Sequence, residues 1–514
     1  MKLYLNTLII AFAVIFQVAC YDDKGNYDYT DISQVKVTDV EEVYSKVSYR
    51  DTLHIVPKIN STNPQDEFEC LWVINPAYIQ TPSMGEQILK DTIGFDKELH
   101  YPVNLRLGTY DLVLKVTNIA TGHAEFIKMS LEVTTPFALG FYALKEENGC
   151  TEIDLHKPDG EVVENVLTMK YGEAMTGEPK SMGLVFSYCY IDPETSKYTF
   201  TSALTICAGK DAKILNLQDM STIFTHENMF WGEANQEEIP RYICPGYFGI
   251  NYLSNQGVSF SYQYLTIPGS GKFGYPLLLS GSEQSNCIPN INCVFSQCLY
   301  FFDELNHRFL VCDFNGALHS YEKAPVIPYN LIFFGRNKVG EDNNGYALFE
   351  DDKTGKRYLY KLVLDTKFSN NPILETFDVP ESSALATATL FGINEQNARI
   401  MYFVKDNQLY SFDLGLHTEK VLVPEGFVAG EEITYISNRY WENTTDEENN
   451  FNYLVIGTHS NGRYKLYMYN TLGGLPTGAP VKVLQGNGKV VKVQFSSNKM
   501  SDNTVDSPVY PATF

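Results

Sequence analysis

Tryptophan, positive charge and long apolar runs are all scarce in this chain of 514 residues. Only 3 Trp stand beside 35 Tyr and 31 Phe, so the aromatic content comes from residues that favour β-strands. The formal net charge is −23 and no basic cluster offsets it, which argues against nucleic acid as a partner. Beyond the N-terminus no segment has about 18 uninterrupted apolar residues, so we expect no transmembrane helix there.

Recognisable catalytic motifs are missing as well. The chain has no HExxH, GxSxG or CxxC pattern, and the GSGK stretch at residues 269–272 lacks the neighbours that a phosphate-binding loop requires. The 9 histidines are scattered, and none has a second ligand at metal spacing. We therefore expect no catalytic residue, no metal site and no cofactor, and we predict that the protein is not an enzyme.

The N-terminus carries a short apolar run that ends at a cysteine. Lys2 precedes the run, Ala19 offers a small residue at a cleavage point, and Cys20 follows it, which predicts a signal peptide over residues 1–19. The ending resembles the lipobox of bacterial lipoproteins, although Gln17 replaces the usual aliphatic residue. That resemblance implies a lipid on Cys20, which would attach the chain to a membrane.

A polar, acidic segment follows the cysteine and predicts a tether over residues 20–32. Asp22 and Asp23 resemble the export signal of Bacteroidetes surface lipoproteins. Under that resemblance the protein is anchored in the outer membrane and faces the cell exterior. The alternative is an ordinary acidic linker on a protein that faces the periplasm.

Nine further cysteines give an odd number of thiols, which cannot all pair within the chain. Their one cluster, at residues 287–298, has no histidine near it, so zinc is a poor fit. We expect buried free thiols.

Residues 33–135 contain short strands with alternating apolar positions. Such strands lie at residues 51–59, 68–74, 108–118 and 125–133, and Trp72 falls on a central one, which favours an antiparallel β-sandwich. Trp72 and Tyr110 resemble the core tryptophan and corner tyrosine of immunoglobulin-like and PKD-like domains. With the sequence after Cys20, the region resembles the PKD-like family of Bacteroidetes lipoproteins.

Residues 137–500 repeat an aromatic strand, a polar turn and a second strand at intervals of about 45 to 60 residues. This period predicts an all-β fold in which a β-propeller of about seven blades follows the sandwich, with residues 501–514 as a tail. Six or eight blades, or a stack of sandwiches, are the alternatives. The seven instances cover residues 140–156, 183–204, 247–265, 298–314, 345–365, 398–414 and 452–470.

Two tryptophans, Trp231 and Trp441, fall outside the alternating strands and are the candidate ligand-binding residues. Residues 215–242 around Trp231 contain helix-friendly stretches and are expected to form an insertion between blades.

The family resemblance implies association with a SusC/SusD-type uptake system of the outer membrane. We therefore expect a surface lipoprotein that binds a glycan or peptide nutrient or helps to present it to the transporter. The alternatives are a protein–protein scaffold of the uptake complex and, third, a propeller hydrolase or lyase.

Overall fold

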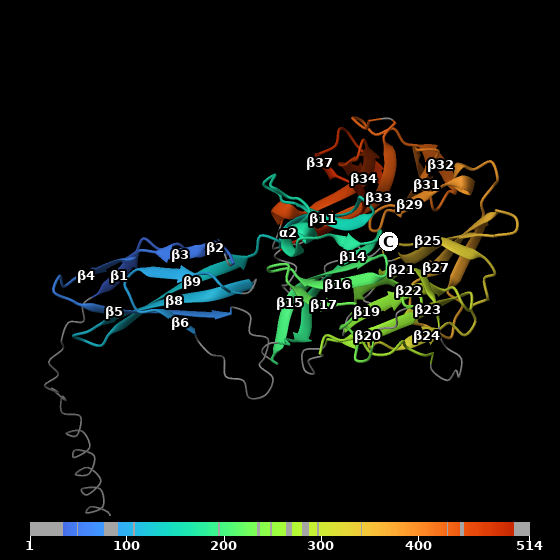
Figure 1. Cartoon of the computed structure of the whole chain (residues 1–514). Coiled ribbons are helices and arrows are strands. Elements are labelled where there is room, and N and C mark those ends of the chain that lie inside the picture. The colour runs from blue at the N-terminus through green and yellow to red at the C-terminus, as the bar shows by residue number, and fades with distance from the viewer. Residues whose placement is uncertain are drawn as a thin grey trace, which may run out of the picture.

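The computed structural model describes residues 34–497, except 49, 77–90, 106–107, 194–195, 234–236, 247–248, 264–269, 280–286, 296–297, 341, 429 and 443–446. The predicted signal peptide, the predicted lipid attachment at Cys20, the predicted tether with Asp22 and Asp23, and the predicted C-terminal tail lie outside these residues. The described chain forms two all-β parts, and in Figure 1 the N-terminal part lies beside the larger C-terminal ring.

The N-terminal part is a β-sandwich. One face is a five-stranded sheet, and two short pairs, β1–β4 and β3–β7, pack on it through a shared apolar core. Trp72 is fully buried in that core, as predicted, and its Nε1 donates to the Asp96 carbonyl at 2.9 Å. The five-stranded sheet has the order β2(Val43–Val47), β9(Ala124–Thr134), β8(Gly108–Asn118), β5(Phe68–Pro76), β6(Asp91–Gly94), and the pairs are β1(Val35–Thr38) with β4(Lys58–Ser61) and β3(Thr52–Ile55) with β7(Leu99–Pro102).

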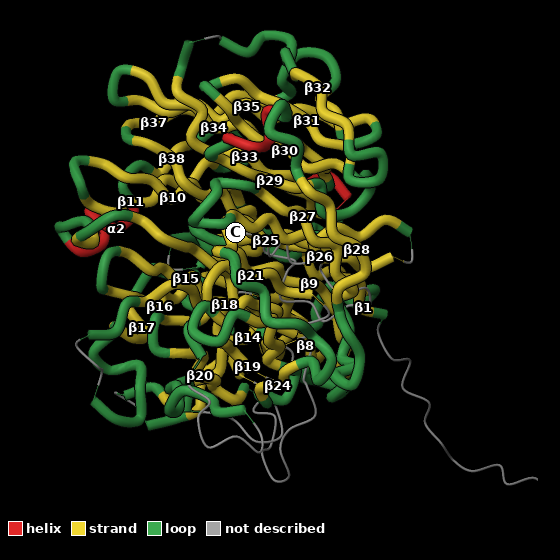
Figure 2. Tube along the Cα trace, turned by 90° about the vertical axis from the view of Figure 1, so that its right-hand side faces the viewer, coloured by secondary structure: helices red, strands yellow, loops and turns green. Residues whose placement is uncertain are grey.

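The C-terminal part is a β-propeller of seven sheets, which confirms the predicted fold class. The sheets follow one another around the ring in Figure 2. From the axis outward, the first blade consists of β38(Lys489–Ser496), β10(Gly140–Glu147), β11(Cys150–His156) and β12(Val162–Val163). The second blade consists of β14(Pro179–Ile191), β15(Tyr198–Ala208), β16(Asp211–Asn216) and β17(Thr222–Thr225). The third blade consists of β18(Pro240–Pro245), β19(Gly249–Ser254) and β20(Gly257–Tyr262).

The next four blades each have four main strands. They are β21(Pro289–Phe295), β22(Cys298–Asp303), β23(Arg308–Cys312), β24(Leu318–Ser320); β25(Asn330–Val339), β26(Asp342–Glu350), β27(Arg357–Val363), β28(Ile373–Asp378); β29(Leu390–Ile393), β30(Ile400–Lys405), β31(Gln408–Asp413), β32(Thr418–Val421); and β33(Glu432–Trp441), β34(Phe451–Ser460), β35(Arg463–Leu472), β37(Lys482–Asn487). Minor elements are α2(Val166–Tyr171), β13(Met175–Thr176), η1(Ala384–Thr387), η2(Glu447–Asn449) and β36(Leu475–Pro476).

The first strand of each blade lines the axis of the ring. Contacts join β38 to β14, β14 to β18, β21 to β25, β25 to β29, β29 to β33, and β33 back to β38. The last strand, β38, pairs antiparallel with β10 of the first blade, so the two ends of the propeller close one sheet. Closing the ring removes the open sheet edges that an unclosed row of blades would expose.

Two-residue turns join the second and third strands of several blades. Asn148–Gly149, Asp406–Asn407 and Asn461–Gly462 all have positive φ angles, and the flanking strands pair directly across each turn. These are type I′ hairpin turns, for which Asn, Asp and Gly are the preferred residues. In these three blades, the pattern that repeats in the sequence is therefore the pair of strands on either side of this turn.

Candidate functional site

The structure separates the two tryptophans that were predicted to bind a ligand. Trp441 ends strand β33 and is only 3 % exposed, with its ring centroid 6.1 Å from that of Phe495. The expectation that Trp441 lies outside the strands is therefore wrong, because it belongs to β33 and its side chain packs in the core between the first and last blades. The residues that follow Trp441 in the sequence are polar and acidic, so the sequence did not indicate that Trp441 belongs to the long axial strand β33.

Trp231 lies at the surface, with 68 % of its area exposed. It belongs to residues 226–239, which connect β17 of the second blade to β18 of the third. The expected insertion over residues 215–242 is correct only for residues 226–239, because the remaining residues complete β16, form β17 and begin β18, and no described residue there is helical. These strands pair with the other strands of the second and third blades, and this tertiary pairing outweighs local helix propensity.

A second chain segment holds Trp231 in place. Its backbone N–H donates to the Phe273 carbonyl at 3.1 Å, and the Phe273 N–H donates to the Met229 carbonyl at 2.8 Å. Phe273 itself is fully buried between the second and third blades. The same segment carries Tyr275, which is 84 % exposed and faces Gly232, next to Trp231.

These two segments enclose a cavity of about 360 Å³, which we call the aromatic pocket. Trp231 and Tyr275 are its exposed aromatic residues, and Glu238, Gln256 and Ser259 supply polar atoms. Among the described residues that line it, two are acidic and none is basic. Its full lining is Phe230, Trp231, Gly232, Glu233, Glu238, Gln256, Ser259, Phe273, Gly274, Tyr275 and Pro276.

The floor of the aromatic pocket contains a buried carboxylate beside a histidine. Glu238 Oε2 lies 3.7 Å from His226 Nε2, and the same nitrogen lies 3.2 Å from the Tyr252 hydroxyl. Burial, followed by the charge of Glu238, raises the pKa of Tyr252 well above its usual value, so this hydroxyl keeps its proton. His226 and Tyr252 do not line the aromatic pocket, so Glu238 is the member of this group that can exchange hydrogen bonds with a polar ligand, while the aromatic residues cover the faces of that ligand.

Sequence reasoning found Trp231 but not the residues that complete its surroundings. Tyr275 follows the GSGK stretch, which was rejected as a phosphate-binding loop, and Glu238 is one of 62 acidic residues. A Tyr-Pro pair in an irregular segment was the available signal for an exposed ring at Tyr275.

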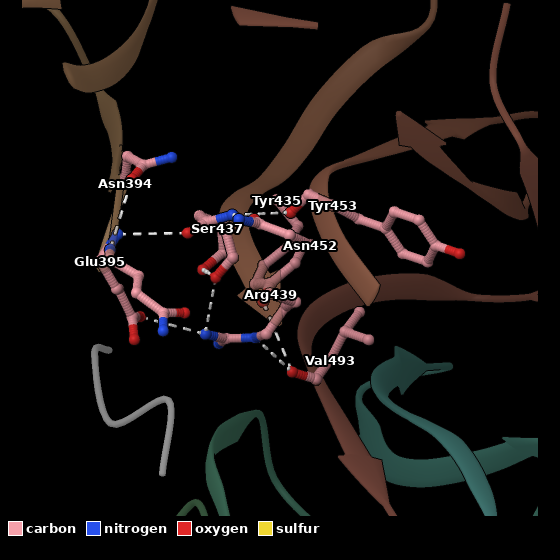
Figure 3. Close-up of polar contacts among 10 residues, drawn as sticks. Asn394, Glu395, Tyr435, Ser437, Arg439, Asn452, Tyr453 and Val493 are labelled. Carbon is pink, nitrogen blue, oxygen red and sulfur yellow. Dashed lines mark hydrogen bonds and ion pairs between the residues drawn. The ribbon is translucent and has the colours of Figure 1, made fainter. Parts of the chain in front are cut away.

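A second cluster of polar groups lies at the propeller axis (Figure 3). Arg439 from β33 is buried, its Nη1 lies 3.4 Å from Glu395 Oε1, and its Nε donates to the Val493 carbonyl of β38 at 2.9 Å. The backbone N–H of Glu395 donates to the Asn438 side-chain oxygen at 3.2 Å. These contacts tie the sixth, seventh and first blades together at the centre of the ring.

Burial dominates the protonation of this axial cluster. It raises the pKa of the Glu395 carboxyl to about 7, although Arg439, Arg336 and Lys492 oppose the shift. Burial, and then the charge of Arg439, lowers the pKa of Lys492 well below its usual value. Sequence analysis missed the cluster, because its members are spread over about 160 residues and meet only when the ring closes.

One exposed group of potential metal ligands also lies outside the sequence prediction. His54 of β3 and His100 of β7 are direct cross-strand partners, with stacked rings 4.0 Å apart, and Glu98 lies beside them. The expectation that no histidine has a second ligand at metal spacing overlooked this group, because Glu98 is two residues before His100 in the sequence and strand pairing adds His54.

The described cysteines are free, as predicted, and all but Cys150 are buried. Burial raises the pKa of Cys207 to about 12, so this thiol stays protonated. No helix in the described part of the chain is long and apolar enough to span a membrane.

Strand pairing thus defines an all-β protein composed of a β-sandwich and a seven-bladed β-propeller. Residues 20–179 match the PKD-like family, and the matched region covers the sandwich and the first strands of the propeller. No curated protein sequence matches the chain.

Several solved structures resemble the chain loosely. A quinonprotein alcohol dehydrogenase-like protein from Bacteroides thetaiotaomicron is 12% identical, with 88% of this chain and 96% of that chain covered and a TM-score of 0.38. A DUF4784 family protein from Bacteroides caccae is 9% identical, with 76% and 95% covered and a TM-score of 0.31. The dihydro-heme d1 dehydrogenase NirN is 11% identical, with 75% and 73% covered and a TM-score of 0.39. Likenesses of this size say nothing about ligand or reaction.

Proposed function

We propose that this protein is a lipid-anchored surface protein that captures a glycan and presents it to a SusC/SusD-type transporter. The observation that supports capture is the aromatic pocket, where Trp231 and Tyr275 are exposed above a buried polar floor. These two rings present large apolar faces to water and do not cover a hydrophobic core. The C–H faces of sugar rings are suitable partners for them.

The polar lining favours a neutral or amino sugar over an acidic one. Glu233 and Glu238 contribute negative charge, and the described lining contains no basic residue to compensate. Carboxylate and amide oxygens accept hydrogen bonds from sugar hydroxyls, so Glu238 and Gln256 would bind the hydroxyl groups at the edge of the sugar ring. An acidic sugar would instead be repelled at this site.

Titration calorimetry with neutral oligosaccharides, on the chain from Tyr21 to Phe514, tests the capture function. Trp231→Ala and Tyr275→Ala are each expected to weaken binding about tenfold or more, which corresponds to roughly 1.4 kcal/mol. Tyr198→Ala removes another exposed aromatic ring, elsewhere on the second blade, and serves as the control. Binding that survives both pocket substitutions would contradict the proposal.

The same samples distinguish the alternatives. If the unmodified protein releases shortened sugars and Glu238→Gln abolishes this release, the protein is a hydrolase or lyase instead of a binding protein. Absence of any glycan binding, together with co-purification of the transporter from membranes, would favour the scaffold.

The location is tested separately in cells. Labelling with a fatty-acid analogue should be lost in Cys20→Ala, because the lipid has no other predicted attachment point. Protease treatment of intact cells should degrade the unmodified protein but spare Asp22→Ala/Asp23→Ala, if the acidic pair directs export. Labelling that persists without Cys20 would overturn the anchor.

A further inference from the structure

Three exposed side chains that can bind a metal meet on the outer face of the β3–β7 strand pair in the sandwich. His54 of β3 lies directly opposite His100 of β7, and Glu98 is two residues before His100. One ring nitrogen from each histidine and one carboxylate oxygen all lie within 4.8 Å of one another. The group therefore offers two imidazoles and one carboxylate, a set of ligands that Zn²⁺ uses in proteins.

The burial pattern of the two strands directs both imidazoles to the surface. Leu53 and Ile55, which flank His54, are buried in the core of the sandwich. Leu99, which precedes His100, is buried in the same core. Successive side chains of a strand point to opposite faces, so both histidines point away from the core and are exposed. A shift of the register by one residue would turn an imidazole into the core, so the packing of the apolar residues fixes the histidine pair.

The two imidazoles are close enough to bind the same ion. Their ring centroids lie 4.0 Å apart, and the ring planes differ by 23°. In a tetrahedral zinc site, bonds of about 2.0–2.2 Å place two ligand atoms roughly 3.3 Å apart. Because all three side chains are exposed, rotation about their side-chain bonds would bring the ligand atoms to this separation without moving the strands.

The chemistry of these ligands favours a transition metal over Mg²⁺ or Ca²⁺. Imidazole nitrogen suits Zn²⁺ and its neighbours in the first transition row, whereas Mg²⁺ and Ca²⁺ bind oxygen ligands. Glu98 adds a negative charge that attracts a cation. Three protein ligands leave the fourth position of a tetrahedral ion to water.

We propose that His54, His100 and Glu98 bind one Zn²⁺ ion, with water completing the coordination. The ion would link β3 to β7, two strands of four residues each that pair with one another in a separate two-stranded sheet. The segment between them in the sequence contains β4, β5 and β6, so bound zinc joins distant parts of the chain and stabilises the sandwich. This site lies in the sandwich and the aromatic pocket lies in the propeller, so the proposal does not depend on glycan capture.

Titration calorimetry with ZnCl₂ at neutral pH, on the untagged chain from Tyr21 to Phe514, tests the proposal. We expect one Zn²⁺ per chain, and we expect Mg²⁺ and Ca²⁺ to bind about tenfold more weakly or less. Scanning calorimetry of the same samples should show that zinc raises the unfolding temperature of the sandwich and that excess EDTA reverses the increase.

The variants assign the site. His54→Ala and His100→Ala each remove one imidazole and should weaken zinc binding about tenfold or more. Both positions are exposed, so these variants should fold, which circular dichroism checks. Glu98→Gln keeps the size of the side chain, removes its charge and should also weaken zinc binding. His123→Ala removes an exposed histidine from the connection between β8 and β9 of the same sandwich, and this matched control should leave zinc binding unchanged. Trp231→Ala should also leave it unchanged, which separates this proposal from glycan capture.

Four results would overturn the inference. The first is the absence of zinc binding, and the second is zinc binding that His54→Ala and His100→Ala both leave unchanged. The third is Ca²⁺ binding as tight as Zn²⁺ binding, which would exclude the imidazoles as the main ligands. The fourth is one Zn²⁺ per two chains, which would place the ion between two copies of the protein.

Discussion

Replacing Glu395 with glutamine should change how the stability of the protein depends on pH. The carboxyl is fully buried at the propeller axis, where Arg439, Arg336 and Lys492 surround it. Despite these cations, burial raises its pKa from the usual 4.5 to about 7. The folded protein therefore holds this proton at pH values where the unfolded chain has released it.

The sign and size of the effect follow from this difference. Between pH 4.5 and about 7 the folded state binds more protons than the unfolded state, so stability falls as the pH rises. The contribution is fully present below pH 4.5 and is lost above about pH 7. Since each pKa unit corresponds to about 1.4 kcal/mol, the loss over this window is roughly 3 kcal/mol. Glutamine is neutral at all these pH values, so it makes no pH-dependent contribution to the free energy of unfolding.

Urea unfolding of the ligand-free protein at a series of pH values measures the effect. The free energy of unfolding of the unmodified protein, minus that of Glu395→Gln, should fall by roughly 3 kcal/mol between pH 4 and pH 8. Glu381→Gln removes an exposed carboxyl in the loop before η1 and should produce a nearly constant difference. A constant difference for Glu395→Gln would refute the argument that burial outweighs the three cations.

Four other outcomes are expected. Trp441→Ala should lower the free energy of unfolding by about 3–5 kcal/mol, because it leaves a cavity at a buried site. Trp231→Ala should lower it by less than about 0.5 kcal/mol, because Trp231 is exposed. Equal losses for the two variants would contradict these placements. Asp154→Asn should cost about 2 kcal/mol, because it removes the buried carboxylate 2.9 Å from Lys145, whereas Glu147 still pairs with that lysine at 3.1 Å; a neutral result would show that the Asp154 pair is dispensable. Ending the chain at residue 488 removes β38 and should abolish the cooperative urea transition of the propeller but not that of the sandwich. In the native protein a thiol reagent should label Cys150 faster than the other described cysteines, and rapid labelling of several would argue against their burial.

The repeat in the sequence predicted the blades through their hairpins. Six of the seven repeated stretches contain the second and third strands of a blade, such as β30 and β31 around the Asp406–Asn407 turn. The stretch at residues 183–204 instead falls on β14 and β15, the two innermost strands of the second blade. Hairpins are detectable because turn residues and alternating strands are local in sequence.

The axial strands were harder to detect. They are buried on both faces or line the axis, so they lose the alternation that marks an outer strand. Trp441 illustrates the consequence, because it was placed in a polar loop although it completes the long strand β33. A polar segment beside a strand end misled the interpretation.

The sequence by itself determined the strand-rich composition, the hairpin period and the sandwich core around Trp72, because these depend on residues close together in the chain. Only the tertiary structure decided which side chains meet. Ring closure brings Glu395, Arg439 and Lys492 to one axis, and two inter-blade segments bring Trp231 to Tyr275. Both arrangements arise from contacts between distant residues, and the free energy of such contacts depends on burial and pairing that no local pattern records.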